Sequence, residues 1–215
     1  MDACGDAFWP TLGYLCGNFA GARIPVVIGL ESCRERIHQD DLKAFSAAFG
    51  TSGAAALFHI AGVTPEAQGL MQAIGGKSGE EMETLKLVHK DFVAAWQALD
   101  SGTGDDAAAI QLVALGNPHL SVTEVARIAE LITRQGVGSK HSDVTVVATL
   151  SRQVLEEAET SGHAQVLKDF GVEFVNDTCW CMLGEIVPYP PILKSRTLIT
   201  NSGKYAHYAP GLVNR

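Results

Sequence analysis

AAIQLVAL at residues 108–115, SVTEVARIAELITRQ at 121–135 and DVTVVATL at 143–150 decide the fold, because together they read as strand, helix and strand. The two outer runs are short and apolar, whereas the middle run repeats apolar residues at helical spacing. Strands separated by helices of this length indicate right-handed crossovers and a mostly parallel sheet.

The alternation continues on both sides of this segment. Downstream, the sequence predicts a helix at 151–170 and strands at 172–176 and 196–201. Upstream, strands are expected at 24–29 and 54–60. We therefore predict an α/β fold of alternating strands and helices with mostly parallel sheets.

Three helices are expected in the first half of the chain. One follows a cap at Asp40 or Asp41, and one begins at Thr64-Pro65-Glu66, where a proline occupies the first helical position. A long amphipathic helix is expected at 80–99. The turn-rich run SGTGDD at 101–106 then predicts a division into two lobes, residues 1–104 and 105–215.

Composition narrows the classes of partner. The 215 residues are 47% hydrophobic and 19% charged, with a formal net charge of -8. The sequence has no cluster of Lys and Arg, which argues against a nucleic-acid or anionic-membrane surface. The most apolar stretch, residues 14–30, is interrupted by Asn18 and Arg23 and is not expected to span a membrane. We expect a cytoplasmic protein that binds a small molecule.

Polar segments follow three of the predicted strands. They are Gly116-Asn117-Pro118-His119, Asp177-Thr178-Cys179-Trp180-Cys181 and Asn201-Ser202-Gly203-Lys204. In an open parallel sheet the ligand crevice lies beyond the carboxyl ends of the strands. The three segments are therefore expected to converge on one edge.

Each segment also has a purely structural interpretation. Ser121 with Glu124 forms a capping box, so Asn117 and His119 could simply shape a helix entry. His119 could equally be a ligand, an acid or base, or a donor to an anionic substrate. Ser202, Gly203 and Lys204 suit a carboxylate or phosphate site, or a capped turn with a solvated lysine.

The cysteines favour free thiols or metal ligands over disulfides. There are five, at positions 4, 16, 33, 179 and 181, without a disulfide-framework spacing. Cys179 and Cys181 could be buried apolar residues, but they could also share a metal. Thiolates suit zinc or iron–sulfur clusters, for which two ligands are too few, so a third must come from elsewhere.

Three motifs together carry a family resemblance: ALGNPHLSVTEV at 114–125, NDTCWCM at 176–182 and NSGKYAHYAP at 201–210. In this order and spacing they resemble the large catalytic part of aconitase X, the divergent branch of the aconitase superfamily. FWPTLGYLCG, IPVVIGL, DDLKAF and LFHIAGVTPEA, further upstream, resemble the same family. The likeness covers essentially the whole chain.

The resemblance implies a dehydratase with a cysteine-bound iron–sulfur cluster that acts as a Lewis acid. Cys179 matches the family's cluster cysteine, and Cys181 is a second candidate ligand. Asn117 stands where phosphomevalonate dehydratases carry a cysteine, which favours the branch that dehydrates cis-3-hydroxy-L-proline. Ser202, Gly203 and Lys204 would then hold the substrate carboxylate.

Within that interpretation His119 and Lys204 are the candidate catalytic residues, and Asn117 lines the pocket with His119. Family members also carry a longer amino-terminal region with another cluster cysteine, and a small swivelling domain or subunit, so the chain resembles a fragment. Two alternatives stay open. The first is the large subunit of a mevalonate 5-phosphate dehydratase, and the second is a non-catalytic fragment that binds a metal or a partner protein.

Overall fold

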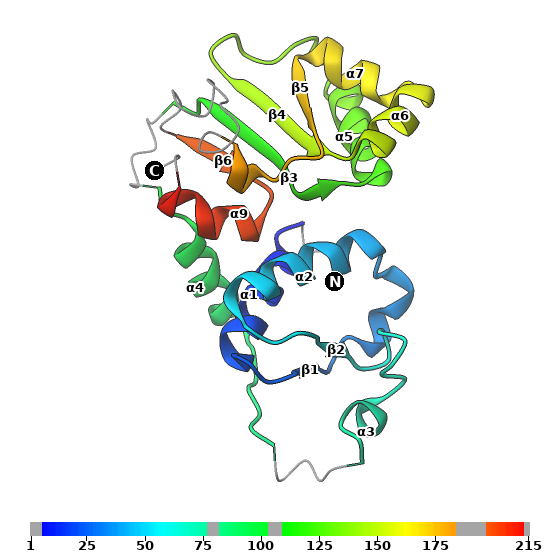
Figure 1. Cartoon of the computed structure of the whole chain (residues 1–215), viewed down its shortest axis with the longest axis vertical. Coiled ribbons are helices and arrows are strands. Elements are labelled where there is room, and N and C mark those ends of the chain that lie inside the picture. The colour runs from blue at the N-terminus through cyan, green and yellow to red at the C-terminus, as the bar shows by residue number, and fades with distance from the viewer. Residues whose placement is uncertain (1–5, 77–81, 103–108, 184–196, 213–215) are drawn as a thin grey trace. The chain divides into compact units, whose positions relative to one another are not determined.

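The computed structural model describes residues 6–76, 82–102, 109–183 and 197–212, and it divides into two compact units (Figure 1). The first unit is Met1–Ala98 and the second is Leu99–Arg215. The sequence predicts a lobe boundary at 104/105, but part of the turn-rich run on which it rests lies outside the described residues. No helix in the described residues is long and apolar enough to cross a membrane.

The second unit is built on a four-stranded parallel sheet, which confirms the expected α/β class. The strand order is β5-β4-β3-β6, and every neighbouring pair is parallel. The strands are β3 (Leu112–Leu120), β4 (Thr145–Leu150), β5 (Val172–Asn176) and β6 (Leu198–Thr200). All four carboxyl ends therefore lie at the same edge.

Successive side chains along a strand point to opposite faces of this sheet and fill two cores, one on each face. Val146, Ala148 and Leu150 of β4 pack with the helices on one face, whereas Val147 packs on the other. The first face is covered by α5 (Val122–Gln135), α6 (Arg152–Thr160) and α7 (His163–Phe170) (Figure 1). The second is covered by η3 (Trp180–Met182), α9 (Gly203–Tyr208) and η4 (Ala209–Gly211).

Helix ends in this unit follow local signals. The predicted capping box is present, since Glu124 N–H donates to Ser121 Oγ at 3.1 Å and Ser121 N–H donates to Glu124 Oε2 at 2.8 Å. The expected single helix at 151–170 is wrong, because the chain breaks at Ser161 and Gly162 into α6 and α7. Gly162 has φ of +81°, in the left-handed region that a helix cannot contain.

The first unit is organised by a helix pair. Its elements are α1 (Phe8–Ala20), β1 (Val26–Val27), η1 (Glu31–Arg36), α2 (Gln39–Ser52), β2 (His59–Ile60), α3 (Leu70–Ala73) and α4 (His89–Leu99). Helix α1 was not expected, because glycines interrupt its apolar residues. Those glycines serve the packing: a Cβ at Gly13 would lie 2.2 Å from the carbonyl oxygen of Phe45 in α2. The two helices can approach closely only with glycine there.

An aromatic core completes this unit. Phe45 is fully buried, and its ring lies 4.6 Å from that of Phe58 and 6.0 Å from that of Phe49. The ring of Phe8 from α1 stacks on that of Phe92 from α4 at 5.4 Å. The core therefore rests on contacts between helices rather than on the sheet, which is a single parallel pair of two-residue strands.

Several predicted boundaries in the first unit are wrong. Helix α2 begins at Gln39, and Asp41 acts from inside it by accepting the N–H of His38 at 2.9 Å. The long helix expected at 80–99 begins only at His89, because the Asp91 carboxylate accepts the N–H of Val88 at 2.7 Å and fixes the first turn there. Thr64 begins no helix, since its hydroxyl accepts the N–H of Ile60 in β2.

Candidate active site

The three predicted polar segments of the second unit do come together at the carboxyl edge of the sheet. The contacts that join them run from β3 to the segment after β5, and from β3 to the start of α9. The expectation that Gly116 to His119 follow the end of their strand is wrong. They lie within β3, where the register with β4 shifts between Leu115 and Leu120.

Asn117 is the centre of the cluster and is 4% exposed. Its Oδ1 accepts a hydrogen bond from Cys179 Sγ at 3.8 Å, and its Nδ2 donates to Cys181 Sγ at 3.8 Å. One amide group therefore contacts both sulfur atoms. Both thiols therefore lie on the side of the segment that faces Asn117, as two ligands of one metal would have to.

The backbone around Asn117 explains why it lies there. Gly116 has φ of +88°, and a Cβ on it would lie 2.2 Å from the carbonyl oxygen of Thr149 in β4. The Thr149 hydroxyl donates to the carbonyl oxygen of Gly116, and the Asn117–Pro118 peptide bond is cis. Only glycine fits at position 116, and the side chain of the next residue, Asn117, contacts both cysteines.

Trp180 anchors the segment that carries the two cysteines. Its indole is 1% exposed, and its Nε1 donates to the carbonyl oxygen of Leu115 at 2.7 Å. Its ring centroid lies 5.2 Å from that of the buried Tyr205 in α9. Sequence analysis gave Trp180 no role. The available signal was its place between two cysteines, because a buried indole N–H needs an acceptor.

Ser202 ties the start of α9 to the same centre. Its hydroxyl donates to the carbonyl oxygen of Asn117 and accepts the N–H of Tyr205 at 2.9 Å. The hydroxyl is therefore both a helix cap and a brace between two segments. Lys204, two residues on, is half-buried, and its positive charge acts on the Cys181 thiol.

His119 lies over the turn that precedes the cysteines. Its Nε2 is 3.0 Å from the carbonyl oxygen of Thr178. A carbonyl oxygen can only accept, so Nε2 carries the proton in this contact and Nδ1 is the acceptor atom of the neutral ring. The neighbouring Asp177 adopts φ of +55°, and the two hydrogen bonds from Arg152 hold its pKa below the usual value.

Burial and the neighbouring groups set the pKa of the Cys181 thiol. Burial raises the pKa of Cys181 above its ordinary value, and the neighbouring Cys179 adds to this. The amide of Asn117 and the charge of Lys204 act in the opposite direction. The balance of these effects favours the protonated thiol of Cys181.

The donor set is incomplete for a metal centre. In the described ranges, no group of three or more Cys, His, Asp and Glu side chains lies close enough to hold a metal ion. Cys179 and Cys181 place two free thiols in one short segment, and both are partly accessible. They fit one part of a cluster site, to which at least one further ligand must be added.

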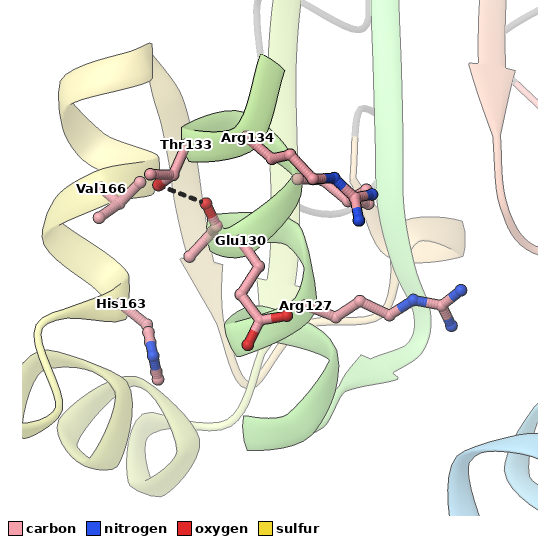
Figure 2. Close-up of a pocket in the computed structure, with 8 residues that line it drawn as sticks. Arg127, Glu130, Thr133, Arg134, His163 and Val166 are labelled. Carbon is pink, nitrogen blue, oxygen red and sulfur yellow. Dashed lines mark hydrogen bonds between the residues drawn. The ribbon is translucent and has the colours of Figure 1, made fainter. Parts of the chain in front are cut away.

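A cavity of about 660 Å³ lies elsewhere, along α5 and α7, and contains none of the predicted site residues. Figure 2 shows the guanidinium groups of Arg127 and Arg134 projecting from one side of α5, whereas His163 lies on the other side, at α7. These charged groups do not converge on a common point. The cavity therefore offers no arrangement that would bind one ligand.

Comparison with known proteins links this arrangement to one family. A family model described as "Aconitase X second domain" matches residues 1–97, and "Aconitase X third domain" matches residues 110–215. A crystal structure of Thermococcus kodakaraensis aconitase X in its holo-form has a TM-score of 0.76 at 26% sequence identity. That similarity covers 98% of this chain and 49% of the other.

Curated relatives fall into two groups by name. Cis-3-hydroxy-L-proline dehydratases of Hypocrea jecorina and Pseudomonas aeruginosa are 45% and 49% identical over 98% of this chain. A phosphomevalonate dehydratase large subunit of Methanothermobacter thermautotrophicus is 34% identical over 94% of it. The chain spans 33% and 34% of the length of the first two relatives and 44% of the third.

Proposed function

The chain belongs to the aconitase X family, and from this premise we propose that it supplies the cysteine-bearing part of a dehydratase acting on cis-3-hydroxy-L-proline. The observation that carries the proposal is the contact of Cys179 and Cys181 with the single amide of Asn117. The choice of substrate rests on the relatives, because 45% and 49% identity to the hydroxyproline enzymes exceeds 34% to the phosphomevalonate enzyme.

Cys179 and Cys181 would hold an iron–sulfur group, together with at least one ligand from outside the described residues. When bound, such a group supplies a Lewis acid that eases departure of the substrate hydroxyl. The chain's contribution is to present two sulfur atoms in a fixed orientation. Asn117 orients both, and Trp180 holds the segment between them against β3.

His119 is the candidate for proton transfer. Because Nε2 donates to Thr178, a proton could be accepted or returned only through Nδ1. This assigns a defined tautomer to the neutral ring. It also ties the histidine to the cysteine segment, so movement of that segment would move the base.

The start of α9 would bind the carboxylate of the substrate. Lys204 supplies a positive charge, and the N–H of Gly203 is a further candidate donor. Ser202 has a different part in this proposal from the one expected, since its hydroxyl already bonds Asn117 and Tyr205. It would keep Lys204 in place rather than contact the substrate.

Reconstitution with iron and sulfide without oxygen tests the metal assignment. The wild-type chain, supplemented with the remaining parts of the Pseudomonas relative, should develop iron–sulfur absorbance that Cys179→Ser abolishes. Cys16→Ala is the matched control, because it removes a buried thiol of the other unit. Absorbance that survives Cys179→Ser would contradict the assignment.

The substrate assignment needs a separate assay of water loss. The supplemented enzyme should act on cis-3-hydroxy-L-proline and not on mevalonate 5-phosphate, and the reverse preference would contradict the proposal. Lys204→Met should raise KM for the amino acid by about tenfold or more, as expected for a lost charged contact. Lys168→Met in α7 is the control, and an unchanged kcat/KM in Lys204→Met would remove Lys204 from the site.

A further inference from the structure

The two outer edges of the β1–β2 sheet are treated differently. The edge of β2 is closed by its own turn, since Ile60 N–H donates to Thr64 Oγ1 at 3.1 Å. The carbonyl oxygen of Ile60 in turn accepts the N–H groups of Val63 and Thr64, both at 3.0 Å. These contacts use the main-chain groups that a further strand beside β2 would need.

The edge of β1 has no such closure. The carbonyl oxygen of Pro25 accepts the N–H of His59 in β2 at 3.0 Å, and that of Val27 accepts the N–H of Ala61, just after β2, at 2.9 Å. Main-chain groups of successive residues point to opposite sides of a strand, so the N–H and C=O of Val26 point away from β2. In the part of the chain that the structure describes, no third strand pairs with this edge.

Exposed apolar side chains lie next to both strands of this sheet. Ile24, which precedes β1 in the sequence, is 52% exposed, and Ile28, which follows it, is 55% exposed. Leu57, which precedes β2, is 43% exposed. Parallel sheets are normally covered on both faces, and exposed edges usually carry charges or an outward-facing proline. The segment from Ile24 to Ile28 has no charge, and Pro25 faces β2 instead of the outer side.

We propose that the outer edge of β1 pairs with an extended apolar strand from the first domain of aconitase X. This inference rests on family membership and not on the proposed activity. Residues 1–97 match the model named as the second domain, and the chain spans about a third of its curated hydroxyproline relatives. The name of that model implies that such proteins also carry a first domain, and this is the occupant that we assign to the edge of the two-strand sheet.

A binding experiment with separately produced polypeptides tests the proposal. The probe is the part of the Pseudomonas aeruginosa relative that corresponds to the first domain of the family. Titration calorimetry should detect a one-to-one complex with the wild-type chain. Val26→Pro removes the outward N–H and should weaken binding by about tenfold or more, as expected for one lost main-chain hydrogen bond with a steric conflict.

Two further variants keep the result interpretable. Val26→Thr retains the N–H and the β-branched shape, and should bind like the wild type. Ile28→Lys leaves every main-chain group in place but puts a charge beside the edge, and should also weaken binding. It carries the test if Val26→Pro lowers the melting temperature of the isolated chain.

Three results would overturn the proposal. One is equal binding by wild type, Val26→Pro and Ile28→Lys. Another is a wild-type chain that forms a dimer on its own and loses it in Val26→Pro, which would make a second copy the occupant. The third is no complex at all. Because no cysteine, cluster or substrate enters this experiment, its failure would leave the proposed dehydratase function untouched.

Discussion

The two units of this chain both contain a parallel sheet, but the sheets differ in size and in their part in the core. The second unit has four parallel strands with a buried core on each face of the sheet. The first has one parallel pair of two-residue strands, and its core is made by α1, α2 and aromatic rings. The comparison teaches that a sheet covered on both faces can hold a site at the ends of its strands, whereas a two-residue sheet depends on the helices that pack around it.

The position of the candidate site follows from this difference. All the contacts that join Asn117, Cys179 and Ser202 start from strands or helix caps of the second unit. Rigid strands hold the segments at their ends, where side chains of separate segments can meet. The first unit has no comparable edge among its described residues.

The largest loss of unfolding free energy is expected when alanine replaces a glycine that lies against a neighbouring backbone. Each unit contains one such glycine that we compare, Gly116 in the second and Gly13 in the first. Gly116→Ala would place a Cβ 2.2 Å from the Thr149 carbonyl oxygen in a backbone of φ +88°. Both strain and overpacking contribute, so we expect a loss of about 3–5 kcal/mol in unfolding free energy. Gly13→Ala makes an equally short contact with Phe45 without the unusual φ, and should cost about 1–3 kcal/mol.

A third glycine separates the two causes. Gly136 ends α5 with φ of +66°, and a Cβ there would meet no atom within 4 Å. Gly136→Ala should therefore cost only the backbone term, about 1 kcal/mol. Chemical denaturation with hydrogen exchange would assign each loss to its unit. Equal losses of unfolding free energy for Gly116→Ala and Gly136→Ala would show that the contact with Thr149 adds nothing to the cost of the first substitution.

Sequence periodicity predicts most of the second unit, and the reason is local. Its strands and helices follow one another with their signals intact, such as the Ser121 and Glu124 box. The first unit was harder to predict because two of its sequence signals have another meaning than the usual one. Gly13 marks a helix contact rather than a turn, and the Thr64 hydroxyl serves β2 rather than a helix.

The sequence predicted which segments meet at the edge of the sheet, but not which side-chain hydrogen bonds join them. The rule that ligands bind beyond the carboxyl ends of strands brought Asn117, Cys179 and Ser202 to one edge. It could not show that the Asn117 amide contacts both thiols, or that the Ser202 hydroxyl is a brace, because such contacts depend on side-chain orientation across different segments.

The next effect concerns the anchor of the cysteine segment. Trp180→Phe keeps the apolar ring but leaves the part-buried carbonyl oxygen of Leu115 without its 2.7 Å partner, at a cost of about 1–3 kcal/mol. It should also separate the two thiols, so a trivalent arsenical, which must bind both sulfurs, should bind more weakly. In the first unit, Phe58→Leu has no such polar partner to lose and serves as the control. Unchanged arsenical affinity in Trp180→Phe would show that the indole does not position the cysteines.

A smaller effect distinguishes the buried thiol of the first unit. Burial raises the pKa of Cys16 to about 11. A pKa that is higher in the folded state gives stability that is present below pH 9 and is lost as the pH rises toward 11. We expect the wild type to lose about 1 kcal/mol more than Cys16→Ala between pH 8 and pH 10. Parallel pH profiles for the two proteins would show that the thiol ionises as freely in the folded state as in the unfolded one.

The smallest effect concerns two exposed ion pairs, one in each unit. Arg152 donates from its backbone N–H and its Nε to the carboxylate of Asp177, at 3.1 Å and 2.5 Å, and lowers its pKa. A lowered carboxylate pKa gives stability that is present above the ordinary value and is lost as the pH falls through the folded-state value. Arg152→Ala removes the side-chain bond but keeps the backbone donor, so the pKa of Asp177 should rise only part of the way to its ordinary value. NMR titration of the carboxyl carbon would measure this.

Arg23→Ala, which breaks the exposed pair with Glu83 in the first unit, should leave that titration unchanged. A complete return to the ordinary pKa in Arg152→Ala would mean that the side chain alone, and not the start of α6, holds the turn before the cysteines.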